Sequence, residues 1–424
     1  MSQPFAPADP ADLSAMAAQI AADLPLLDAT RNEDIGQFVR QHLSDDGLTA
    51  DPTVLAALVA AVSSARSLYG PLSALMDDET VSDIAVNRWD DVWGLTATGW
   101  TKSSVHFADN DDLLSFISSR LAYLTGRAID ESDPILDGRI ENGPRICAMI
   151  PPTVEHPQVT IRKFSAQQLD LPTLSSGETP AMSRVMAATL MAAVRARLNI
   201  MVAGGAGAGK TTLLSALLRA VPASQRLVII EDTLELQWWK AEDPTPNLAR
   251  LLADDKRPGG RAVDLLRASL RLSPDRVVVG EVRGPEVLAM LGAMNIGLDG
   301  SMSSIHANNP ADAVSRLVML GLQADSNLDS DAIGQQIGAA LQLLIQMSRN
   351  PVDGYRYISE ISEVVWDGAS RVTTLPLFAW APEAGAPIAE GWKAINRPSF
   401  WADRLAPIWG PHWPDPWAAV TPAS

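Results

Sequence analysis

A glycine-rich segment that ends in a lysine and two threonines is the part of this chain most clearly suited to chemistry. It reads Gly204-Gly205-Ala206-Gly207-Ala208-Gly209-Lys210-Thr211-Thr212 and matches the pattern GxxxxGK[ST]. The glycines allow successive backbone N–H groups to point toward a single phosphate chain. Lys210 can reach the β- and γ-phosphates, and the hydroxyl of Thr211 can hold Mg²⁺. The segment therefore predicts a site for a nucleotide phosphate.

The alternative is a glycine-rich turn with an incidental lysine. The neighbouring sequence argues against it, because an apolar run at 199–203 predicts a strand before the loop and the run 213–218 predicts a helix after it. The start of that helix would add the positive end of its dipole to the loop. Lysine is also scarce in this chain.

Two further apolar runs end in acidic residues. Residues 227–230 precede Glu231 and Asp232, and residues 276–280 precede Glu281. Parallel sheets collect their functional groups at such strand ends. A phosphate site of this kind needs an acid at its metal or at the attacking water, and either strand end can deliver one. We predict that Thr211, Asp232 and Glu281 hold the metal, with Glu231 also around it, and that Glu281 positions the attacking water. Each carboxylate taken alone could instead cap a loop.

A run of small residues at 301–305 predicts a short strand that ends at His306. An imidazole at that place could sense the γ-phosphate. A lone histidine is more often structural, and on pattern alone that alternative stays open.

The elements around these motifs predict a chain of several parts. We expect an N-terminal tail with three helices over 1–70, an α+β domain over 71–166 and a linker over 167–180. The α+β domain should contain short strands at 82–87, 92–95, 105–107, 145–150 and 159–164, and a helix at 111–124. An α/β core with a parallel-rich sheet should occupy 181–380, followed by a Trp- and Pro-rich tail over 381–424.

Charge and composition exclude several classes of protein. The 33 Lys and Arg against 50 Asp and Glu give a net charge of −17, which disfavours nonspecific binding to nucleic acid or anionic membrane. A single cysteine, Cys147, excludes an intramolecular disulfide framework. Neither a signal peptide nor an apolar stretch of membrane-spanning length is visible, so we expect a cytoplasmic protein.

The order of these motifs resembles the secretion and pilus-assembly traffic ATPases, most of all their CpaF-like branch, which serves tight-adherence pili. The resemblance rests on GGAGAGKTTLL, IIEDTLEL, DLLRASLRLSPDRVVVGEVRGPE and GLDGSMSSIHANNPADAVSRL, and on upstream segments such as PRICAMIPPTVEHPQVTIRKF. It covers about residues 72–377.

The resemblance implies a RecA-like P-loop NTPase core that binds ATP and Mg²⁺, with residues 204–212 as the Walker A loop. It also implies the following assignments: an acidic box of Glu231, Asp232 and Glu235; a Walker B acid, Glu281, beside Arg283; a histidine box of Gly300, Ser301 and His306; and upstream arginines, Arg145 and Arg162, that reach the nucleotide. The chain departs from the family pattern at Gly297-Leu298, where a glycine–histidine pair is usual. Arg250 and Arg257 are candidates for the arginines that follow the acidic box.

The function implied is a homo-hexameric ATPase that drives pilus assembly or protein secretion. It would work at an inner-membrane platform protein, at the cytoplasmic face of the membrane and without direct nucleic-acid binding. A conjugation ATPase that moves DNA–protein substrates is the main alternative. A catalytically inactive scaffold and a small-molecule P-loop kinase are less consistent with the motifs. The tail could dock on a membrane partner or pack on its own domain.

Overall fold

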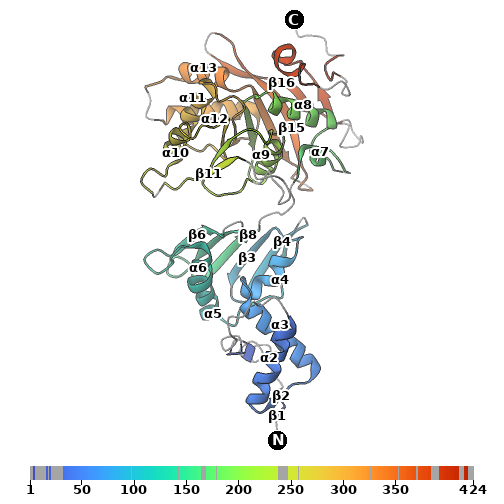
Figure 1. The fold of residues 1–424 in the computed structure, drawn as a ribbon, viewed down its shortest axis with the longest axis vertical. Coiled ribbons are helices and arrows are strands. Elements are labelled where there is room, and N and C mark those ends of the chain that lie inside the picture. Colours follow the sequence, from blue (N-terminus) through green and yellow to red (C-terminus); the bar gives the residue numbers. More distant parts are fainter. Residues whose placement is uncertain are drawn as a thin grey trace. The chain divides into compact units, whose positions relative to one another are not determined.

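The computed structural model describes residues 3–4, 16–17, 19–20 and 32–418, with gaps at 97, 141–142, 164–168, 178, 237–246, 256, 325–326, 352, 369–370, 383–390 and 410–414. The chain divides into two compact units, Met1–Ser165 and Ala166–Ser424 (Figure 1). Each unit has its own hydrophobic core.

The first unit begins with two packed helices, α2 (Asn32–Asp45) and α3 (Pro52–Arg66). Their small core includes Ile35, Val39 and Leu58. The carboxylate of Asp51 accepts the N–H groups of Thr53 and Val54 at 2.8 and 3.1 Å, and so caps the start of α3. Two short strands, β1 (Gln3–Pro4) and β2 (Leu48–Thr49), pair in parallel. Most of the region expected to form the first helix lies outside the described residues.

The rest of this unit is a six-stranded antiparallel sheet in the order β5-β4-β3-β8-β7-β6. Helical segments cover one face, and its alternate residues, such as Ile84, Val159 and Ile161, form the core. The strands are β3 (Asp83–Arg88), β4 (Asp91–Thr96), β5 (Gly99–Lys102), β6 (Ile135–Arg139), β7 (Arg145–Met149) and β8 (Gln158–Arg162). The helical segments are η1 (Gly70–Leu72), α4 (Ser73–Asp77), α5 (Asn110–Ser115), η2 (Phe116–Leu121) and α6 (Ala122–Thr125).

The expected strand at 105–107 is wrong. Residues 99–102 form β5 instead, and the segment that follows is irregular. Phe107 is buried against Phe116 with a ring separation of 5.2 Å, and its N–H donates to the carbonyl of Trp89. The apolar–polar alternation thus reflects one anchored side chain rather than strand pairing.

The second unit is built on a nine-stranded sheet in the order β11-β10-β12-β13-β9-β14-β15-β16-β17. The first six strands in this order run parallel and the last three add antiparallel pairs, as expected for the α/β core. The strands are β9 (Ile200–Gly204), β10 (Leu227–Glu231), β11 (Leu248–Leu252), β12 (Arg276–Val279), β13 (Met302–His306), β14 (Leu343–Arg349), β15 (Arg356–Trp366), β16 (Val372–Trp380) and β17 (Trp392–Ala394).

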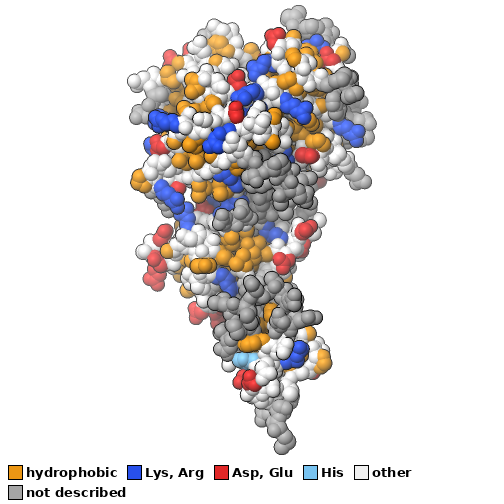
Figure 2. Space-filling model, in the orientation of Figure 1, with side chains coloured by type: hydrophobic (Ala, Val, Ile, Leu, Met, Phe, Trp, Pro, Cys, Tyr) orange, Lys and Arg blue, Asp and Glu red, His pale blue; other side chains and the backbone are white. Residues whose placement is uncertain are grey.

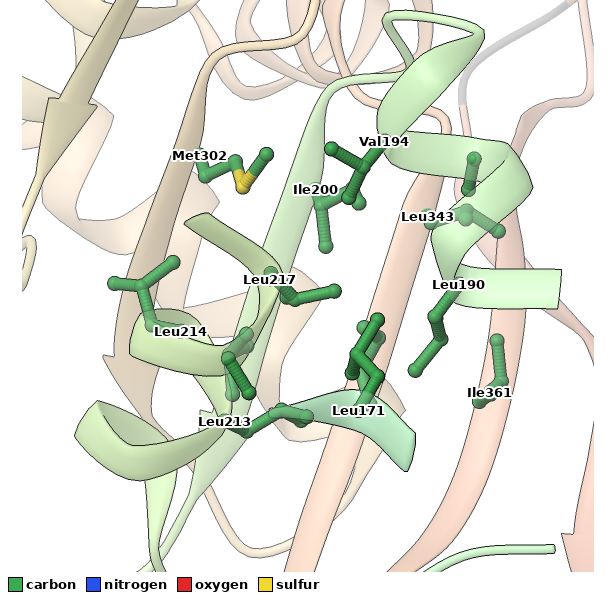
Figure 3. Packing of buried hydrophobic residues seen from close by; sticks show 14 of the residues in the cluster. Leu171, Leu190, Val194, Ile200, Leu213, Leu214, Leu217, Met302, Leu343 and Ile361 are labelled. Atoms are coloured by element: carbon green, nitrogen blue, oxygen red, sulfur yellow. The ribbon is translucent and has the colours of Figure 1, made fainter. Parts of the chain in front are cut away.

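Helices cover both faces of this sheet, because its central strands are continuous apolar runs buried on both sides. One face carries α7 (Leu171–Leu174), α8 (Arg184–Arg195) and α9 (Lys210–Arg219). Figure 3 shows Leu190 and Val194 of α8 and Leu217 of α9 packed with Ile200 of β9 and Leu343 of β14. The other face carries α10 (Ala262–Ser269), α11 (Glu286–Asn295), α12 (Pro310–Leu322) and α13 (Ser330–Ala340).

The described residues on the N-terminal and C-terminal sides of the α/β core pack against that core. Residues 171–174, within the stretch expected to be a linker, form α7, and Leu171 is buried in the core of the second unit. In the C-terminal segment, β17 extends the sheet and a π-helical turn, η4 (Trp401–Leu405), lies beside α8. Trp417 is fully buried against Phe378 and Trp401. This burial favours a tail that packs on its own domain.

Two surface properties bear on the sequence expectations. In the part of the chain that the structure describes, no helix combines the length and the apolarity needed to cross a bilayer. On the face drawn in Figure 2, Lys and Arg side chains are scattered among acidic and apolar ones.

Candidate nucleotide site

The glycine-rich loop joins the central strand β9 to the start of α9. Gly207 and Gly209 have φ values of +69° and +94°, which glycine adopts without strain. Gly204 is required for a different reason, because a Cβ there would lie 2.8 Å from the carbonyl oxygen of Met347 on β14. The loop is therefore held against β14, and α9 begins at Lys210 with its N-terminus at the loop.

Lys210 is buried within the loop that precedes it. Its Nζ donates to the carbonyl oxygens of Gly204 and Gly205, both at 3.1 Å, and lies 3.2 Å from Nδ1 of His306. Burial lowers the pKa of Lys210, and the nearby carboxylate of Glu281 opposes this shift. The ammonium group is thus placed inside the loop, where a polyphosphate would replace its carbonyl contacts.

A continuous polar chain runs from Lys210 across the ends of the neighbouring strands. His306, the last residue of β13, places Nε2 3.1 Å from Oε1 of Glu281, which follows β12. Oε2 of Glu281 lies 3.2 Å from Arg283, and Arg283 also pairs with Asp232, which follows β10. The parallel sheet therefore brings together five groups from four strand ends.

The surroundings of His306 favour the neutral form of its imidazole. Burial lowers its pKa, Glu281 raises it, and Lys210 lowers it again. A neutral ring can accept from Lys210 at Nδ1. Its Nε2 lies 3.1 Å from Oε1 of Glu281, but this buried oxygen has no hydrogen-bond partner of suitable geometry among the described residues. His306 thus lies between the loop lysine and Glu281, within 3.2 Å of both.

Glu231 is held by the protein itself. It is 4% exposed, and its Oε1 accepts the N–H groups of Glu235 and Leu236 at 2.7 and 2.8 Å. Its Oε2 lies 2.9 Å from the guanidinium of Arg250. Burial raises its pKa, while these donors oppose the shift. Both oxygens are therefore engaged in shaping the turn after β10.

The predicted metal ligands are oxygen donors, and they are only partly gathered. Asp232 and Glu281 share Arg283, whereas Oγ1 of Thr211 is 3.5 Å from Oε2 of Glu235. Among the described residues, no three acidic, histidine or cysteine side chains form a ready metal cluster. Such a donor set fits Mg²⁺, which is usually held by one or two protein oxygens together with substrate phosphates and water. Thr211 and one of these carboxylates could hold it.

The histidine box depends on a close contact at Gly300. Gly300 has φ +83°, and a Cβ there would lie 2.1 Å from the buried guanidinium of Arg276, which donates to the Gly300 carbonyl. Ser301 is buried and donates its hydroxyl to the carbonyl of Leu298. Leu298 packs partly buried against the adjacent core, so an apolar residue suits the position that departs from the family pattern.

Arg145 and Arg162 lie in the first unit, where both make ion pairs. Arg145 contacts Asp137 at 3.1 Å, and Nε of Arg162 contacts Asp83 at 2.8 Å. Both acidic partners belong to the same unit. A contact of either arginine with nucleotide stays a prediction.

Comparison with known proteins complements this geometry. Residues 67–354 match the family described as type II/IV secretion system protein. The chain belongs to the type II/IV secretion system ATPase family.

Relatives with known names match most of the length of this family member. A putative conjugal transfer protein of Mycobacterium tuberculosis is 35% identical over 320 residues, 73% of this chain and 88% of the relative. The type IV secretion system protein VirB11 of Brucella suis is 30% identical over 336 residues, 71% of this chain and 91% of the relative. The solved structure of the ATPase DotB of Yersinia pseudotuberculosis has a TM-score of 0.52 at 14% identity, over 69% of this chain and 77% of that chain. The core of this chain is RecA-like, as expected.

Several contacts near this site were not predicted from the sequence. Gln346 of β14 is buried and donates to the carbonyl of Ala307, next to His306. Glu286 accepts the N–H groups of Arg283 and Gly284 at 2.6 and 2.8 Å, which fixes the backbone that carries Arg283. Glu286 lies at the start of α11, and an acidic residue in the first turn of a predicted helix could have indicated it.

Proposed function

We propose that this chain hydrolyses ATP with Mg²⁺ at the Lys210 loop. The chain of contacts from Lys210 through His306 to Glu281 carries the proposal, because it joins a phosphate-binding group to the acid expected to orient water. Bound Mg²⁺ would neutralise charge on the β- and γ-phosphates.

In the proposed reaction, Lys210 exchanges its carbonyl contacts for the β- and γ-phosphates. Glu281 orients a water whose oxygen attacks the γ-phosphorus, and the bond to the β,γ-bridging oxygen breaks to give ADP and phosphate. Glu281 accepts the proton that the water loses. When phosphate binds, His306 loses its lysine partner, and with its proton on Nδ1 the ring could donate a hydrogen bond to the γ-phosphate. Glu231 serves as a positioning residue for the acidic turn, and Asp232 holds Arg283.

Phosphate release from the purified full chain tests this assignment. Lys210→Ala should abolish both ATP binding and turnover, and Glu281→Gln should keep binding but lose turnover. Lys393→Ala, an exposed lysine on β17 of the same unit, is the matched control. Full activity in Lys210→Ala would exclude this site. Tight ATP binding with no turnover by the wild-type chain would favour the scaffold alternative.

We further propose that the active form is a homo-hexamer in which Arg145 and Arg162 reach the nucleotide. Membership of the type II/IV secretion system family and the CpaF-like order of the motifs support a role in pilus assembly or secretion. In this role the protein would dock on a membrane platform protein and would not contact nucleic acid directly. Light scattering with and without an ATP analogue should show a mass near six times 45.3 kDa. A mass of about 45.3 kDa with and without the analogue would overturn the proposed hexamer.

A conjugation ATPase is the second candidate. Its support is specific, since relatives at 30–35% identity are described as conjugal transfer proteins. The neighbouring genes discriminate the two functions. Pilin and platform genes would support pilus assembly, whereas relaxase and coupling-protein genes would support conjugation.

A further inference from the structure

The hairpin of β14 and β15 runs alongside the phosphate loop. β14 lies parallel to β9, with Met347 opposite Gly204, the residue at which the loop begins. The hairpin pairing continues beyond this point and ends with Arg349 opposite Arg356. Because the two strands run in the same direction, the end of β14 extends past β9 on the side of the loop.

Both hairpin arginines lie against the loop. Nε of Arg356 donates to the carbonyl oxygen of Gly207 at 2.8 Å. A Cβ built on Gly207 would be 3.7 Å from a terminal nitrogen of Arg349, and one built on Gly209 would be 3.5 Å from Cδ of Arg356. Both arginines are exposed, and among the described residues neither has a carboxylate within ion-pair distance.

The hydrogen bond from Arg356 to the Gly207 carbonyl restrains a loop that is otherwise costly to order. A segment with several glycines loses much conformational entropy when it is fixed in one shape. A phosphate-binding loop directs N–H groups toward the anion, so a carbonyl held from outside helps to keep that orientation. Fixing the shape before the ligand arrives lowers the ordering cost at binding.

We propose that Arg356 is a positioning residue that holds the phosphate loop in its nucleotide-binding shape through the Gly207 carbonyl. This inference rests on the proposed function, because it concerns the same nucleotide. The hairpin thereby controls the affinity of the loop from outside the glycine-rich motif, and Arg349 adds a second positive charge beside Gly207.

Equilibrium titration of the full chain with a fluorescent ATP analogue tests the proposal, together with steady-state ATP hydrolysis. Arg356→Ala should raise Kd and KM about five- to tenfold, since it removes a hydrogen bond from a charged donor, and should leave kcat within about twofold. Arg356→Lys should restore part of the affinity, because it keeps the charge but not the planar Nε–H group. Arg371→Ala removes an exposed arginine that precedes β16, and it should bind as the wild type does.

The number of binding sites per chain separates positioning from simple structural support. If Arg356 only supports the fold, fewer Arg356→Ala chains should bind the analogue, and the chains that do bind should keep the wild-type Kd. This result would overturn the proposal. An unchanged Kd with full stoichiometry in Arg356→Ala would overturn it as well. Failure of the proposed function looks different: the wild type would bind no analogue, or Lys210→Ala would bind it fully.

Discussion

Arg145 and Arg162 lie directly opposite each other on the antiparallel strands β7 and β8. Arg139 on β6 faces Arg145 from the other side, so three like charges share one row across the sheet. Like charges in this position repel and destabilise a sheet. The pairs with Asp137 and Asp83 offset that repulsion, and a polyphosphate would offset it further.

Arg145→Ala should therefore leave stability almost unchanged while it reduces ATP turnover. The pair with Asp137 is largely solvent-exposed and contributes about 0–1 kcal/mol, and its loss is balanced by relief of repulsion within the row. Urea unfolding and phosphate release on the same preparation check this. A drop in unfolding free energy of more than about 2 kcal/mol would show that the residue is structural. Unchanged turnover would remove Arg145 from the proposed site.

The protonation of His306 predicts a loss of stability in acid. Burial holds the pKa of His306 below the ordinary 6.5. Between that lower pKa and pH 6.5, the unfolded chain binds a proton at this residue and the folded chain does not. The stability contributed by the neutral ring is complete above about pH 6.5 and is lost as pH falls through the lower folded pKa. Urea unfolding at about pH 7.5 and about pH 5.5 should show a larger loss for the wild type than for His306→Asn, which cannot titrate. Equal losses would contradict the assignment of a neutral imidazole.

The buried carboxylate of Glu231 should matter for folding. Glu231→Ala removes the acceptor of two backbone N–H groups and leaves Arg250 without this partner, at a cost of about 3 kcal/mol. Asp232→Ala changes the adjacent carboxylate, whose side chain is 52% exposed, and should cost less than about 1 kcal/mol. Chemical denaturation of both variants measures the difference. Similar stabilities would mean that Glu231 does not hold the turn.

The C-terminal segment should stabilise the second unit. Trp417→Ala removes a fully buried ring that packs on Phe378 and Trp401, which should cost about 3–5 kcal/mol. Trp100→Ala, with a ring on the edge strand β5 that is 50% exposed, should stay within about 0.5 kcal/mol. Thermal unfolding followed with and without ATP is the measurement. Equal effects of the two changes would show that Trp417 is not part of the core.

The sequence predicted the elements that local spacing controls. Glycine spacing, apolar runs and strand-end acids located the loop of Lys210 and the positions of Glu281 and His306. Local patterning failed at 105–107, because a single buried ring produced the same alternation as a strand.

Other contacts depend on which strands become neighbours, and a linear pattern does not contain that order. Arg356 and the Gly207 carbonyl are 149 residues apart and meet only because β14 lies beside β9. Arg250 reaches Glu231 because β11 pairs with β10, although the sequence marks it only as a candidate. Glu231 accepts hydrogen bonds from the N–H groups of Glu235 and Leu236 because the chain turns back over the end of β10.

The place of Trp417 has a consequence for synthesis on the ribosome. The first unit has its own core within Met1–Ser165, so it can fold while later segments are still being translated. The second unit completes its core only after residue 417 has emerged from the exit tunnel. We expect nascent chains stalled near residue 400 to fail to bind nucleotide, because the core of the second unit is still incomplete at that length.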